Sequence, residues 1–120
     1  MKAQIVWKVV YKSGNGSLWS CVVWRAATVQ YRVGRWVSAP PWLAAGGYHL
    51  LAFKTRAAAR VFTKQECCMV YKAKATEVSE VLPPMSWLSA VIGGWLHKSG
   101  GHWPEQSVMC KKIKLLCRAR

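Results

Sequence analysis

The chain has 120 residues, 52% of them hydrophobic and eight of them Trp, which excludes a disordered protein. A chain of this length can bury roughly two thirds of its unfolded surface, so we expect a single domain over residues 1–120. Its charge is the outlier, because 18 Lys and Arg against four Glu and no Asp give a net charge of +14. The positive electrostatic field of such a chain attracts polyanions, so the favoured partners are nucleic acid, an acidic protein or an anionic membrane surface.

The first quarter of the chain predicts antiparallel strands. Residues 5–12 alternate between an aromatic face and a mixed basic face that carries Lys8 and Lys12. Ser13–Gly16 contains Asn-Gly, which is typical of a tight hairpin turn, so Leu18–Trp24 should be the return strand. Val29–Val33 alternates in the same way and predicts a third strand.

The next segment is punctuated by glycine and proline. Arg35–Val37 predicts a short strand that ends before Pro40-Pro41, because proline cannot extend a ladder or a helix interior. Ser38–Gly47 is therefore expected to be a loop.

The centre of the chain predicts a strand, a helix and a second strand. Tyr48–Phe53 is a short apolar run typical of a buried strand, and Thr55 stands where a helix N-cap should. Arg56–Gln65 consists of strong helix formers and is expected to bury a face that includes Val61. From Met69 to Thr76 the period changes to two, which predicts a half-buried strand.

The last part predicts one further helix and one strand. Trp87–Leu96 has apolar residues at helical spacing, Ser99–Pro104 should be a loop, and Val108–Arg118 alternates as a final edge or near-edge strand. The predicted fold is α+β, a small mainly antiparallel sheet of five or six strands with one or two helices on one face. No segment is long enough to span a membrane and no secretory signal precedes the first strand, so a cytoplasmic protein is expected.

Two sets of bases are candidates for binding phosphates. Arg56, Arg60 and Lys64 recur every four residues and form one stripe on the central helix, where a simple solvated face is the alternative interpretation. The predicted strands supply a second set, which is Lys72, Lys74, Lys112 and Lys114. Seven bases also stand next to an aromatic residue, a pattern found in proteins that bind single strands. Because neighbours in a strand point to opposite faces, buried aromatics and solvated bases explain the same pairs.

The tryptophans outside the predicted strands suggest a contact with a partner. Trp87 and Trp95 lie on the apolar stripe of the last predicted helix and could anchor a protein partner or a homodimer seam. Packing in the core is the alternative for both residues.

The sequence offers few residues that could serve in catalysis or metal binding. His49 followed by Glu77 and Glu80 is the one catalytic constellation, and ion pairing with the many bases is the alternative role of the glutamates. No cofactor is predicted. The five cysteines contain no C-x-x-C pair, so no metal site is predicted. We expect reduced thiols, with a disulfide that involves Cys21 or Cys117 as the alternative.

Several motifs resemble a family of small uncharacterised proteins of phages and archaeal viruses. The motifs are Tyr31–Pro40 (YRVGRWVSAP), Gly47–Phe53, the T-x-x-x-A-x-x-F run from Thr55 to Phe62, and Pro104–Met109. The resemblance implies a turn before a strand–helix–strand unit and carries no assigned activity. The central unit is more loosely similar to ADP-ribosyltransferase-like folds, which implies NAD chemistry. Glu77 and Glu80 do not have the spacing of the paired-Glu motif of those enzymes, and the S-T-S element is absent.

Together these features favour a small basic accessory protein of a virus or mobile element that binds nucleic acid through a cationic face. The alternatives are a protein-interaction module or inhibitor that targets an acidic host surface, and an ADP-ribosyltransferase-like enzyme.

Overall fold

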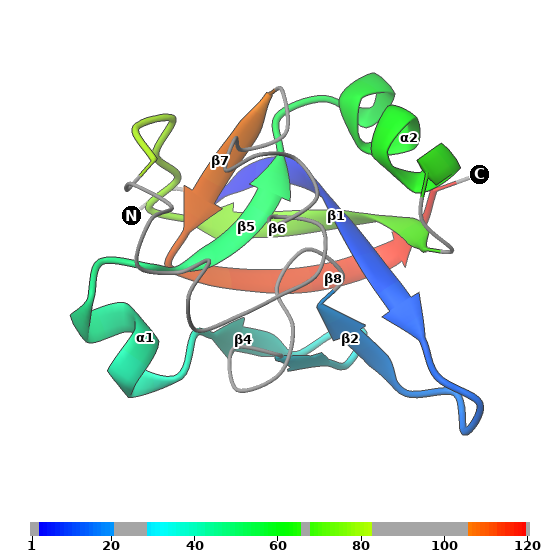
Figure 1. Ribbon diagram of the computed structural model, residues 1–120, viewed down its shortest axis with the longest axis horizontal. Coiled ribbons are helices and arrows are strands. Elements are labelled where there is room, and N and C mark those ends of the chain that lie inside the picture. Colours follow the sequence, from blue (N-terminus) through cyan, green and yellow to red (C-terminus); the bar gives the residue numbers. More distant parts are fainter. Residues whose placement is uncertain (1–2, 21–28, 66–67, 83–105, 120) are drawn as a thin grey trace.

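The computed structural model describes residues 3–20, 29–65, 68–82 and 106–119, without the side chains of residues 62, 64 and 65. Figure 1 shows the helices and strands of this part. The strands are β1 (Gln4–Lys12), β2 (Leu18–Ser20), β3 (Gln30–Tyr31), β4 (Trp36–Ser38), β5 (Leu50–Phe53), β6 (Met69–Thr76), β7 (Ser107–Cys110) and β8 (Lys112–Arg118). The helices are α1 (Pro41–Ala45) and α2 (Arg56–Gln65).

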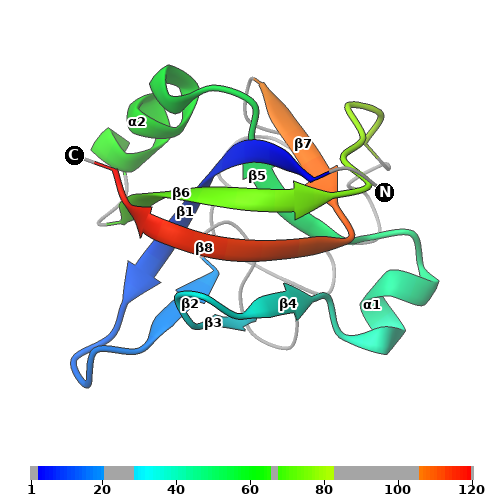
Figure 2. The same cartoon turned by 180° about the vertical axis from the view of Figure 1, so that it is seen from behind.

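The strands form one curled antiparallel sheet. Its order is β3-β2-β1-β6-β8-β4, and β5 pairs with both β1 and β7. The outermost strands of this order, β3 and β4, are joined by residues 32–35 alone, which can span at most about 18 Å. The two edges must therefore approach each other, and the backbone N–H of Gly34 in this turn donates to the carbonyl of Leu115 on β8. Figure 2 shows β3 and β4 running beneath β8, while β5 and β7 form a second layer behind.

The predicted α+β class and antiparallel pairing are confirmed, but the sheet is larger than expected. Its described part has eight strands where five or six were predicted, and one reason is that residues 107–118 form two strands, β7 and β8. The helices do not share one face. α2 packs against β1, β5 and β6, whereas α1 lies at the opposite end of the molecule (Figures 1 and 2).

Side chains alternate along β6 and β8 as predicted. Ala73 and Ala75 of β6 are buried together with Ile113 and Leu115 of β8. The lysines at the positions between them point to the outer face, so the inner face of these two strands belongs to the hydrophobic core.

The faces of β1 differ from the prediction. Val6, Lys8 and Val10 of the expected basic face are buried, whereas Ile5 and Tyr11 at the two ends of the expected aromatic face are about half exposed. In the middle of the strand both faces are covered, because Val9 is also buried. Alternation defines two faces but does not say which one meets the core. Here the pairing of Val6 with the buried Ala73 decides it.

Two connections also differ from expectation. The segment expected to be a loop contains α1, because Pro40 occupies the N-cap and Pro41 the first turn, where a missing N–H costs nothing. The helix ends at Gly46, and Gly47 takes a positive φ of 87°. The expected single strand at residues 108–118 is broken at Lys111, and β8 is an interior strand between β6 and β4.

The predicted hairpin and α2 are confirmed. Gly16 has a positive φ of 88° in the turn between β1 and β2. Thr55 caps α2 by accepting the N–H of Ala58 at 3.2 Å. Among the described side chains of this helix Ala59 is fully buried, whereas Val61, expected to be buried, is 59% exposed. The predicted helix at Trp87–Leu96 and the loop at Ser99–Pro104 lie outside the described residues.

Candidate nucleic-acid interface

A row of side chains crosses the outer face of the sheet over four strands. Ile5 on β1 is opposite Lys74 on β6, Lys74 is opposite Lys114 on β8, and Lys114 is opposite Trp36 on β4. Residues directly opposite each other in antiparallel strands point to the same face. The sheet therefore brings two predicted lysines together and flanks them with a tryptophan that is 44% exposed.

The other two predicted sheet lysines lie on the same two strands, one on each side of this row. Lys112 stands two residues before Lys114 on β8, and Lys72 stands two residues before Lys74 on β6. The four lysines lie along roughly 13 Å of two adjacent strands, because strands rise about 3.3 Å per residue. We call Trp36, Lys72, Lys74, Lys112 and Lys114 the lysine platform; Figure 2 looks onto the strands that carry it.

The platform is electrostatically unfavourable for the isolated protein. Like charges at directly opposed positions of antiparallel strands destabilise the pair, and Lys74 faces Lys114. The Lys114 ammonium lies over the Trp36 ring, 5.2 Å from its centroid, which offsets part of the cost through a cation–π contact. Exposed aromatic and cationic groups thus share one surface.

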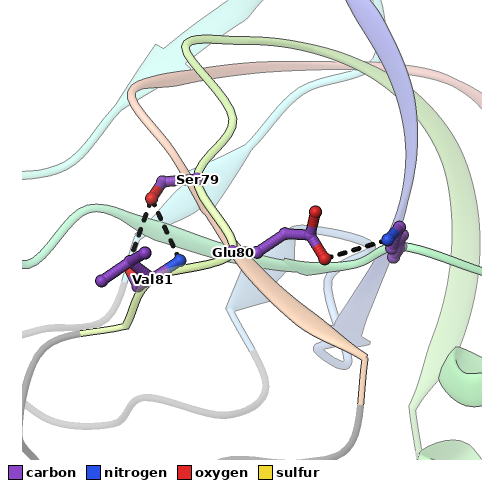
Figure 3. A network of polar contacts seen from close by, with 4 residues as sticks. Ser79, Glu80 and Val81 are labelled. Carbon is purple, nitrogen blue, oxygen red and sulfur yellow. Dashed lines mark hydrogen bonds and ion pairs between the residues drawn. The ribbon is translucent and has the colours of Figure 1, made fainter.

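The two glutamates that the structure describes pair with lysines outside the platform. Glu80 binds Lys54 at 2.9 Å (Figure 3), and Glu77 binds Lys111 at 3.4 Å. The expected ion-pairing role of these glutamates is therefore confirmed. His49, the third member of the catalytic constellation, donates its backbone N–H to the sulfur of Met109 and is half buried.

The helical stripe lies on a helix that packs against one platform strand, β6, and has no main contact with β8 or β4. Arg56 and Arg60 are exposed on α2, whose main contacts are with β1, β6 and β5, and the Lys64 side chain lies outside the described part. Arg60 lines a cleft of about 450 Å³ with Arg118 at the end of β8. The prediction that this stripe lies opposite a buried Val61 is wrong, because Val61 faces solvent and Ala59 faces the sheet.

The other features singled out in the sequence, which are the tryptophans, the cysteines and a possible metal site, do not form a functional site in the described residues. Trp87 and Trp95 lie outside the described residues. Cys110 is a buried free thiol and Cys117 an exposed one, whereas Cys68 is disulfide-bonded, so the thiols are not all reduced. Within the described ranges no group of three or more potential ligands gathers to hold a metal ion, and no helix there is long and apolar enough to cross a bilayer.

A buried lysine lies on the inner side of the sheet, where the sequence predicted a solvated one. Lys8 is 2% exposed, its ammonium donates to the carbonyl of Leu51, and it lies 5.2 Å from the ring centroid of Tyr31. Burial lowers the pKa of Lys8 to about 8, and the neighbouring Cys110 opposes this shift. The signal in the sequence was the position of Lys8 between Val6 and Val10 on one face of the strand.

Burial also disfavours the charged forms of the two titratable groups near Lys8. Burial raises the pKa of the Tyr31 hydroxyl far above its ordinary value and that of the Cys110 thiol to about 12. In the described part of the chain the Tyr31 hydroxyl is also the buried side-chain polar atom without a hydrogen-bond partner. Such a polar group is unfavourable in a core unless something satisfies it.

The family of the chain is not shown by comparison with known proteins. No protein-family model matches it, and neither a curated protein nor a solved structure does.

Proposed function

We propose that the protein binds nucleic acid, in single-stranded form, on the lysine platform. The observation that carries this proposal is the juxtaposition of Lys74 and Lys114 beside the exposed ring of Trp36. Single-strand binders combine a cationic track for phosphates with aromatic rings on which bases stack. The net charge of +14 adds a long-range attraction for any polyanion.

The cost of the platform supports the proposal. Four lysines on adjacent strands repel one another, and the two described glutamates pair with Lys54 and Lys111 instead. Phosphates of a bound strand would supply the missing negative charge and release their own counterions. The origin in a virus or mobile element stays a prediction from the resemblance of Tyr31–Pro40 and the other motifs.

The test is the salt dependence of binding. Fluorescence anisotropy with short labelled oligonucleotides, single-stranded and duplex, is measured between about 50 and 200 mM salt. The variant Lys72→Gln/Lys74→Gln/Lys114→Gln should lower the slope of log affinity against log salt by about 2 for single strands, because each phosphate contact contributes about 0.7.

The matched control is the helical stripe, which loses the same charge. The variant Arg56→Gln/Arg60→Gln/Lys64→Gln should leave most of the slope unchanged. A slope that falls in the helix variant and persists in the sheet variant would place binding on α2 and refute the platform. No binding of any oligonucleotide at about 50 mM salt would reject nucleic acid as the ligand, and an acidic protein partner would then be the remaining polyanion.

Replacement of Trp36 is a second, independent test of single-strand binding on the lysine platform. Trp36→Ala should weaken single-strand binding by about 1–3 kcal/mol, the contribution of one stacked base, with little change in the salt slope. Circular dichroism checks that the fold is intact. Equal affinities of the variant and the parent protein would exclude stacking on this ring.

A further inference from the structure

A cleft of about 450 Å³ opens at the end of the curled sheet, between the β1–β2 hairpin, β3 and the start of β6. Lys12, Leu18 and Tyr31 are opposite one another across β1, β2 and β3, so their side chains point to the same, inner side of the sheet. Leu18 and Tyr31 are buried and Lys12 is exposed, which places Lys12 at the rim. The volume lies within the range of small-molecule sites.

The described lining of this cleft carries positive charge and no negative charge. Lys12 and Arg32 are its charged residues, and both are exposed. Asn15 adds a polar group with a defined orientation, because its Oδ1 accepts the N–H of Ser17 and so turns the two amide N–H donors away from that bond. Cationic and N–H donors together are suited to a phosphate group.

Aromatic residues supply the inner part of the cleft. The half-buried Tyr71 and the buried Tyr31 both line it. The Lys8 ammonium lies over the Tyr31 ring and is on the same face of β1 as Lys12, four residues further into the sheet. A third positive charge therefore lies next to the deepest lining residue, where the low dielectric strengthens its attraction for an anion.

Tyr31 provides an observation of a different kind. Its hydroxyl is buried and has no hydrogen-bond partner, and no described carboxylate accompanies the buried Lys8 charge. Both facts are costs to the empty protein. A bound anion would reduce the electrostatic part of this cost.

We propose that this cleft binds a phosphorylated planar aromatic molecule, a nucleotide, with its phosphate on Lys12 and Arg32 and its base against Tyr71. The site is separate from the lysine platform, and the proposal does not depend on binding there. The nucleotide can be a free monophosphate or the phosphorylated end of a strand, and the chemistry recognised is the same.

The first experiment is calorimetric titration of the full chain with adenosine 5′-monophosphate. We expect saturable binding with a Kd of about 1 mM or tighter. Lys12→Gln/Arg32→Gln should weaken it at least tenfold, because each lost charged hydrogen bond typically costs about that much. No saturable binding, or equal affinity of this variant and the parent protein, would overturn the proposal.

Another cationic cleft in the described part of the chain is the matched control. It also measures about 450 Å³ and carries two arginines, Arg60 and Arg118, but its described lining contains no aromatic residue. Arg60→Gln/Arg118→Gln should leave adenosine monophosphate binding unchanged, and ribose 5-phosphate should bind the parent protein more weakly than adenosine monophosphate. A tenfold loss in the control variant would contradict the assigned cleft, and equal binding of the two ligands would contradict the role of Tyr71.

Oligonucleotides with and without a 5′-phosphate distinguish the two sources of the ligand. A preference for the phosphorylated strand that Lys12→Gln/Arg32→Gln removes supports a strand end, and indifference to the phosphate while adenosine monophosphate still binds supports a free nucleotide. Lys72→Gln/Lys74→Gln/Lys114→Gln should not change adenosine monophosphate binding. The experiments therefore distinguish an error in the proposed platform from an error in the proposed cleft.

Discussion

Replacing Lys8 by Met should make the stability of the protein less dependent on alkaline pH. Lys8 is 2% exposed, and its pKa falls from 10.5 to about 8 on folding because burial disfavours the ammonium. Between these two values the unfolded chain holds a proton that the folded chain has released, so the contribution of Lys8 to stability rises with pH. It is complete above pH 10.5 and lost as the pH falls through about 8.

The magnitude follows from the two pKa values. A shift from 10.5 to about 8 corresponds to about 3 kcal/mol, since one pKa unit is about 1.4 kcal/mol. Cys110 and Tyr31 act in the opposite direction, because burial raises the pKa of both groups and folding then retains protons above pH 9 to 10. Both groups are present in Lys8→Met as well, so the difference between the two proteins largely isolates Lys8.

The assay is urea unfolding followed by tryptophan fluorescence at pH 7, 8, 9 and 10. We expect Lys8→Met to be as stable as the parent protein or more stable at pH 7, and to lose up to about 3 kcal/mol relative to it by pH 10. Lys12→Met, an exposed position on the same strand, is the control. A stability difference between Lys8→Met and the parent protein that stays constant from pH 7 to 10 would show that Lys8 is not desolvated in the folded protein.

Two predictions concern α2. Thr55→Ala should lower the free energy of unfolding by about 1 kcal/mol, and Thr55→Ser should not, because the hydroxyl accepts the N–H of Ala58; thermal unfolding measures both, and equal melting temperatures would argue against the cap. Ala59→Leu should destabilise the protein by about 1–3 kcal/mol through overpacking, since Ala59 is fully buried. Val61→Leu, at 59% exposure, should change stability by less than about 0.5 kcal/mol, and the reverse ranking in urea unfolding would restore the face predicted from the sequence.

Local signals in the sequence were sufficient to predict most of the elements. Asn-Gly at the hairpin, Thr55 before α2 and the change of period at Met69 each act within a few residues, so they identify a turn, a cap and a strand without knowledge of the fold. The alternation along β6 and β8 likewise separated the outer lysines from the buried residues. The four lysines of the platform could therefore be named from the sequence alone.

The tertiary structure decided which faces are buried and which residues meet. A strand has two faces, and only the pairing of β1 with β6 turns Val6 and Lys8 inward and leaves Ile5 outside. The register of β6, β8 and β4 sets Lys74 against Lys114 and Trp36, a contact between residues up to 78 positions apart in the chain that no local pattern encodes. Curling of the sheet through the turn at residues 32–35 then places Tyr31 beneath Lys8 and opens the cleft beside Lys12, because the two edges of the sheet approach each other.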